Sequence, residues 1–209
     1  MKKIRITFLS IFFFLIFTNM SFASQVCDFN TSLYIKELQN PATIKNIDIT
    51  LLDNRKWIIN SLNIITNKRL GLAIPPKLKK RFEAKIIVNY MFGKCFLDAK
   101  IRQSGDKLDH IKFNKKNNEI NQSIDVRIKT GNILSIVSFK LLLPETRNDQ
   151  NEILGTLLLR KLGFIAPKTF FVNTSINGKK IKYLFQEKSE KELIENSKRK
   201  EGPILEGDE

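Results

Sequence analysis

Three pairs of β-forming segments, each joined by turn residues, constrain the fold of this chain most strongly. Within each segment apolar and polar residues alternate, as they do in strands with one buried face. The pairs are Phe82–Met91 with Cys95–Gln103, Gln122–Lys129 with Ile133–Leu143, and Lys168–Ile176 with Lys179–Gln186. The last pair flanks Asn177-Gly178, the strongest short signal for a hairpin. We therefore predict three β-hairpins.

Helical patterns surround these hairpins, and a short strand precedes them. We predict the strand over Ile44–Leu51 and helices over Thr31–Leu38, Asp53–Ile65, Gln150–Leu162 and a short stretch from Glu190. Gly71 and Pro75-Pro76 mark a loop, which we take as a boundary. Residues 24–80 are then an N-terminal extension or a small subdomain, followed by a unit over 81–209. The predicted fold class is α+β, with a largely antiparallel sheet and flanking helices.

The first 23 residues have the layout of a secretory signal peptide. Lys2, Lys3 and Arg5 precede an apolar run over Ile6–Phe17, and Ser21-Phe22-Ala23 supplies small residues at a cleavage site. The run is shorter than the about 20 apolar residues that span a membrane. The alternative is an uncleaved membrane anchor. We predict an exported protein, periplasmic or secreted, that has no membrane association after cleavage.

The chain is strongly basic. Its formal net charge is +15, and loss of the three basic residues of the signal leaves +12. Such a charge favours anionic partners. However, the lysines are spread along the chain, and no arginine-rich patch is interleaved with aromatic residues. Together with export, this argues against nucleic acid as a partner.

Cys27 and Cys95 are the only cysteines, and His110 is the only histidine. In an oxidising compartment the two cysteines can pair, and the alternative is two unpaired thiols. Two cysteines and one histidine are too few for a zinc site of the usual kind, and we predict no metal site built from these residues. It also leaves little material for histidine-dependent hydrolysis.

Two stretches carry candidate site residues. Asp106, Asp109 and His110 lie within one short segment, Gly105–His110, whose alternative role is that of an ordinary turn. The second stretch places Lys140 on a strand and Glu152 at the start of the next helix. In protein kinases, such a lysine contacts nucleotide phosphates and a helical glutamate orients it. The alternative is that Lys140 faces solvent and that Glu152 completes a capping box with Asp149.

The order of features from Cys95 onward resembles the N-terminal lobe of the CotH kinase-like family, which has an atypical kinase fold. The matching segments are Lys100–Gly105, Phe139–Leu143, Glu152–Thr169, Val172–Gly178, Tyr183–Glu187 and Lys200–Leu205. They cover roughly half of the chain, by pattern rather than by one decisive motif. Gln103 and Val137 depart from the pattern, where the family has glycine and lysine.

The resemblance implies a kinase-like N-lobe with an N-terminal helical extension. It also implies that Lys140 contacts phosphates, that Glu152 orients Lys140, and that Gln186 and Glu187 lie nearest the base. The cofactors would be ATP and a divalent metal. The catalytic aspartates of the family belong to a second lobe, which we expect to be absent from this chain. The partner would be a protein substrate or a separate C-lobe chain.

Two functions follow from these observations. The first is an exported CotH-like module, truncated, split or degenerate (a pseudokinase), that retains nucleotide binding. The second is a periplasmic or surface module that binds or has a structural role without catalysis.

Overall fold

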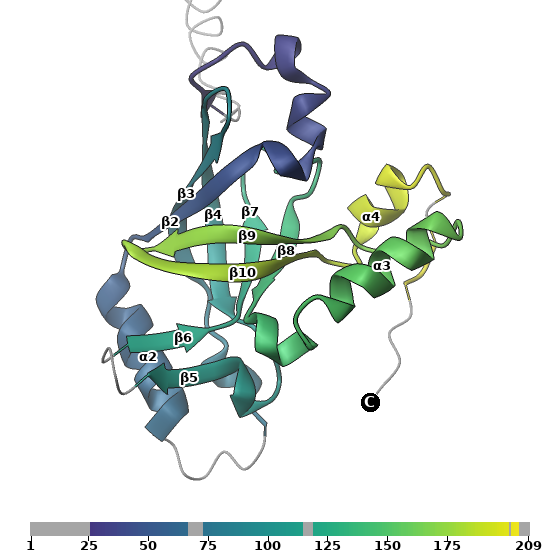
Figure 1. The fold of residues 1–209 in the computed structure, drawn as a ribbon. Helices are drawn as coiled ribbons and strands as arrows, with labels where there is room; N and C mark the ends of the chain where they lie inside the picture. The colour runs from purple at the N-terminus through teal and green to yellow at the C-terminus, as the bar shows by residue number, and fades with distance from the viewer. Residues whose placement is uncertain (1–25, 67–72, 115–118, 201, 205–209) are drawn as a thin grey trace, which may run out of the picture.

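Seven strands form a closed barrel in the computed structural model, which describes residues 26–66, 73–114, 119–200 and 202–204. The barrel strands are β2 (Ile44–Leu51), β3 (Phe82–Tyr90), β4 (Lys94–Gln103), β7 (Ile124–Ile128), β8 (Ser138–Leu142), β9 (Thr169–Ile176) and β10 (Lys179–Glu187). Their order is β4-β3-β2-β9-β10-β8-β7, and β7 returns to β4 (Figure 1). The pair β2–β9 is parallel, and the other barrel pairs are antiparallel.

The predicted α+β fold, a sheet with flanking helices like a kinase N-lobe, is wrong. The described part of the chain is mostly β, with three short α-helices. The difference arises at one edge of β4. Cys95 and Phe96 pair with the short strand β1 (Val26–Cys27), whereas Ala99–Gln103 pairs with β7. Because β7 occupies an edge that an open sheet would leave free, the sheet closes on itself.

Inward-facing apolar residues alternate with outward-facing residues along the strands, and the inward-facing ones fill the barrel. In β4 the buried residues include Cys95, Leu97, Ala99 and Ile101, whereas the residues between them face outward. The other strands contribute aliphatic residues in the same way, and Tyr183 and Phe185 of β10 complete the interior. The Tyr183 hydroxyl donates a hydrogen bond to the carbonyl of Gln122 (2.9 Å), so its polar end is satisfied.

The helix α2 (Asn54–Thr66) lies at one end of the barrel beside the hairpin β5 (Ile111–Asn114) and β6 (Glu119–Gln122) (Figure 1). Trp57 enters the core and meets the ring of Phe82 edge-on. The sequence predicts α2 closely, because its apolar residues recur at helical spacing. The β5–β6 hairpin was not predicted.

Residues near the N-terminus form a separate layer. The helix predicted over Thr31–Leu38 is wrong: two short 3-10 helices, Thr31–Tyr34 and Glu37–Gln39, occupy this stretch. Phe29 and Tyr34 pack with Phe92, and Phe92 stacks on Tyr90 of β3. Residues 24–80 therefore contribute both β2 and this aromatic layer to the barrel. Residues 1–23, predicted as the signal peptide, lie outside the described residues.

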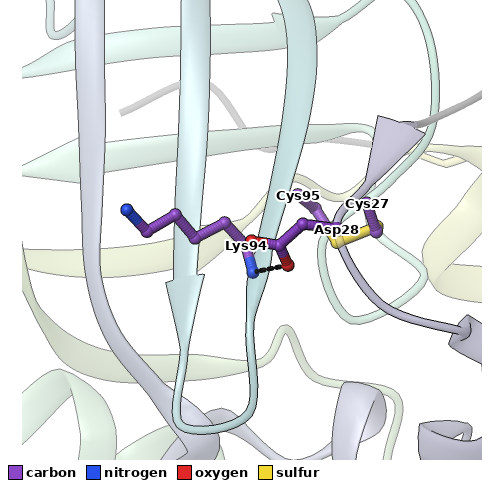
Figure 2. The surroundings of a disulfide bond; sticks show 4 residues. All are labelled: Cys27, Asp28, Lys94 and Cys95. Atoms are coloured by element: carbon purple, nitrogen blue, oxygen red, sulfur yellow. Dashed lines mark hydrogen bonds between the residues drawn. A yellow bond between two sulfur atoms is a disulfide. The ribbon is translucent and has the colours of Figure 1, made fainter.

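A disulfide joins Cys27 to Cys95, 68 residues apart (Figure 2). The two residues are directly paired in the β1–β4 ladder. Beside them, the carboxylate of Asp28 accepts a hydrogen bond from the backbone N–H of Lys94 (2.6 Å). The disulfide and this hydrogen bond hold the N-terminal strand on the barrel.

The remaining helices, α3 (Asn151–Lys161) and α4 (Lys191–Asn196), lie outside the barrel (Figure 1). The predicted cap of α3 is wrong. Gln150 is the N-cap residue and makes no side-chain capping bond, and Asp149 has a left-handed backbone (φ 55°). Glu152 is therefore available for another contact.

Candidate functional site

A row of polar side chains crosses the outer surface of four neighbouring strands. Gln186 of β10 is paired with Lys140 of β8, Lys140 with Asp125 of β7, and Asp125 with Arg102 of β4. Directly paired residues in a ladder point to the same face. These four side chains therefore form a continuous row across the barrel wall.

Asp125 is the centre of this row. It is only 2% exposed, and its carboxylate lies 3.1 Å from Arg81, 3.2 Å from Arg102 and 3.5 Å from Lys188. Burial raises the pKa of Asp125, but the positive charges of Lys188, Arg102 and Arg81 outweigh that effect and hold the pKa below its ordinary value. Asp125 is therefore ionised at neutral pH and holds basic side chains from three parts of the chain.

The segment Gly105–His110 lies near this row. Residues of the segment and of the row together line a cavity of about 290 Å³. Asp106 forms an ion pair with Lys79, which keeps the pKa of Asp106 low. His110 is buried, and its Nδ1 lies 3.0 Å from the Ser123 hydroxyl. Burial lowers the pKa of His110, and the charges of Arg147 and Lys140 lower it further, against the opposing effect of Asp109. The imidazole is therefore neutral at neutral pH.

Basic residues outnumber acidic ones around the cavity. The basic residues in its lining are Lys79, Arg102, Lys107, Lys140 and Arg147, and the acidic ones are Asp106, Asp109 and Asp125. The buried Nε atoms of Arg102 and Arg147 have no hydrogen-bond partner. Since a buried donor without a partner is costly, these two guanidinium groups have unused capacity for an acceptor. The cavity can thus hold a negatively charged, oxygen-rich group.

The structure brings most of the predicted site residues together. Lys140, Asp106, Asp109 and His110 all line this cavity, so the two predicted stretches meet in one place. At the edge of the row, Gln186 donates a hydrogen bond from its Nε2 to the Glu152 carboxylate (2.5 Å). Glu152 thus reaches the row through Gln186, the residue that is paired with Lys140.

Glu187 lies apart from this group. It is buried on the opposite face of β10 from Gln186, and its carboxylate accepts a hydrogen bond from the backbone N–H of Lys168 (3.0 Å). Adjacent strand residues point to opposite faces, so Gln186 and Glu187 cannot line the same site.

Several residues of the site were not predicted from the sequence. They are Asp125, Lys79, Arg81, Arg102 as a charged group, Arg147 and Lys188. Only Arg102 has a local signal in the sequence. Alternation along its strand places it on the outward face, two residues after Lys100. Arg81 and Lys188 reach Asp125 only through pairing between distant segments, which a single sequence does not display.

No cluster of ligating side chains suited to a metal ion occurs among the described residues. The expected ATP and divalent metal stay predictions from the resemblance.

Comparison with protein-family models finds no matching family, and comparison with curated proteins finds no match. The CotH-like resemblance is thus an untested prediction. Across the described ranges, no helix has the length and apolar character needed to cross a membrane.

Proposed function

We propose that this protein is an exported binding module whose polar cavity accepts an anionic group, either a phosphate or a carboxylate. The observation that carries the proposal is a cavity lined mainly by basic side chains, two of which, Arg102 and Arg147, each have a buried Nε donor without a partner. Charge-assisted hydrogen bonds from arginine to carboxylate or phosphate are among the stronger polar interactions in proteins.

The surrounding residues support an anion rather than a cation. Asp125 and Asp106 are already committed to ion pairs with basic residues. A bound cation would have to compete with these lysines and arginines for the same carboxylates. An anion would instead meet donors that have capacity to spare.

Calorimetric titration tests the proposal with three probes: inorganic phosphate, citrate, and ATP with and without Mg²⁺. We expect at least one probe to bind, and Arg147→Gln to weaken its binding about tenfold through loss of a charge-assisted hydrogen bond. Arg55→Gln, on the exposed surface of α2, is the matched control and should bind as the unaltered protein does. Absence of binding by all three probes would contradict the proposal, as would equal weakening in both variants.

Binding of ATP and binding of simple anions have different consequences. If ATP binds and Lys140→Ala weakens it, the nucleotide prediction gains support. If phosphate or citrate binds and ATP does not, the module recognises a smaller anionic group.

Two features support the exported part of the proposal. Residues 1–23 have a signal layout, and a disulfide such as Cys27–Cys95 persists in an oxidising compartment. Expression in a bacterial host followed by mass measurement of the exported fraction tests it. We expect a chain that begins at Ser24 with the disulfide formed, and a full-length chain retained in the cytoplasm would contradict it.

A further inference from the structure

The helix α3 and the turn after it expose an unusually apolar surface. Seven large apolar side chains within twelve residues are exposed: Leu154, Leu157, Leu158, Leu159, Leu162, Phe164 and Ile165. Leu154, Leu162 and Phe164 are 68%, 63% and 62% exposed. We call these seven residues the α3 apolar face. Scattered exposed leucines are common on proteins, but a contiguous group of this size marks an interaction surface.

The contacts of α3 with the barrel leave this face uncovered. Thr156 is the buried residue of the helix, and Glu152 contacts Gln186. Leu154, Leu158 and Leu162 recur every fourth residue and so lie in one row along the helix. The helix is therefore fixed to the barrel by its N-terminal half and presents leucines away from it.

The segment that carries the α3 apolar face is basic. From Ile153 to Gln186 the chain has no aspartate or glutamate, whereas it has six basic residues. Two of them, Arg160 and Lys161, are exposed on α3 itself. The helix α4 contains glutamates, but residues 188–200 as a whole have five basic and three acidic residues. Within them, Glu190 and Glu195 are ion-paired with Lys188 and Lys191.

We propose that the α3 apolar face binds the surface of an anionic lipid membrane. A helix of eleven residues is about 16 Å long, too short to span a bilayer but suited to lie in its interface. Leucine and phenylalanine would enter the boundary between headgroups and acyl chains, and Arg160 and Lys161 would meet the headgroup phosphates. This membrane contact replaces the expectation of no membrane association.

The charge pattern favours a lipid surface over a second copy of the chain. Two copies meeting through this face would bring Arg160 and Lys161 of each close to those of the other, and such like-charge contacts are unfavourable. An anionic membrane offers the opposite charge together with an apolar layer.

Vesicle flotation tests the proposal with the chain from Ser24 onward, which contains every described residue. Vesicles of phosphatidylcholine alone are compared with vesicles that contain phosphatidylglycerol. We expect binding to the anionic vesicles, reduced at high salt. The double variant Leu154→Asn with Leu158→Asn should bind the anionic vesicles at least about tenfold more weakly than the unaltered protein does. Arg160→Gln with Lys161→Gln should weaken binding roughly fivefold for each charge removed.

The matched control is Leu33→Asn with Leu52→Asn, two leucines elsewhere on the surface that are similarly exposed. All three double variants should unfold within a few degrees of the unaltered protein, because the substituted side chains are exposed and only the lower helix propensity of asparagine weighs against α3. The proposal is wrong if the α3 leucine variant floats as well as the control, or if neutral vesicles bind equally well. A dimer that this variant dissociates, without vesicle binding, would instead assign the face to a second copy of the chain.

Discussion

Lys140 and Asp125 lie directly opposite each other in the β7–β8 ladder, on the outer face of the barrel. Asp125 is also directly paired with Arg102 across the β4–β7 ladder. One buried carboxylate therefore lies between two basic residues in the row, and Arg81 and Lys188 contact it as well. Without that carboxylate, four basic side chains would face one another, although Lys188 would keep an acidic partner in Glu190.

The Asp125→Asn substitution should therefore destabilise the fold. Removing one partner of a buried ion pair leaves uncompensated charge, and we expect a loss of about 3 kcal/mol in the free energy of unfolding. Urea denaturation at pH 7 measures it. The control is Asp98→Asn on the exposed face of β4, which should change stability by about 0.5 kcal/mol or less. A loss of similar size in both variants would contradict a special role for Asp125.

The contribution of Asp125 should also depend on pH. Its pKa in the folded protein is below the ordinary 3.8 that applies to the unfolded chain. The unfolded state therefore takes up the proton first as the pH falls. The stabilisation is complete well above pH 3.8, begins to fall as the pH approaches 3.8, and is lost as the pH falls through the folded pKa. We expect the stability difference between the unaltered protein and Asp125→Asn to shrink between pH 5 and the acid limit of folding. A stability difference that stayed constant over this pH range would contradict the lowered pKa of Asp125.

Gly105 and Gly178 form a matched pair for the packing around His110. Both have a φ of +86°, so alanine carries a backbone cost of about 1 kcal/mol at either position. A Cβ at Gly105 would lie 2.1 Å from the His110 ring, whereas a Cβ at Gly178 would meet nothing within 4 Å. We expect Gly105→Ala to be the more destabilising by about 2 kcal/mol, because it displaces a buried ring. Thermal and urea unfolding of the two variants measure the difference, and equal losses would show that the ring moves freely.

Local patterns predicted the strands better than they predicted the barrel. The alternation over Phe82–Gln103 and the Asn177-Gly178 turn specify β3–β4 and β9–β10, because each hairpin pairs residues that are close in the sequence. Closure depends instead on β4 with β7 and on the parallel pair β2–β9, which join distant segments. No local pattern specifies such pairings.

The same limit explains what was missed in the site. The apolar run from Ile133 indicated a strand that reaches Leu143, but Leu134 and Ser135 have left-handed backbones (φ 58° and 64°), so β8 begins only at Ser138. Lys140 could be placed on the outer face by alternation, whereas its partner Asp125 follows from the register of two strands. The sequence thus indicated Lys140, Asp106 and His110 individually, and the barrel brought them together.

The Cys27–Cys95 disulfide should contribute strongly to stability. It encloses a long loop, because its two cysteines are separated by 68 positions in the sequence, and the chain-entropy model assigns such a crosslink about 4 kcal/mol. We expect Cys27→Ser with Cys95→Ser to lower the free energy of unfolding by about that amount, because the unfolded chain regains its freedom. Urea denaturation with and without a reducing agent measures it: reduction should bring the unaltered protein close to the double variant and leave the variant unchanged. The paired strand β1 and the Asp28–Lys94 hydrogen bond persist in the variant, so a much smaller loss would show that these contacts alone hold the N-terminal strand on the barrel.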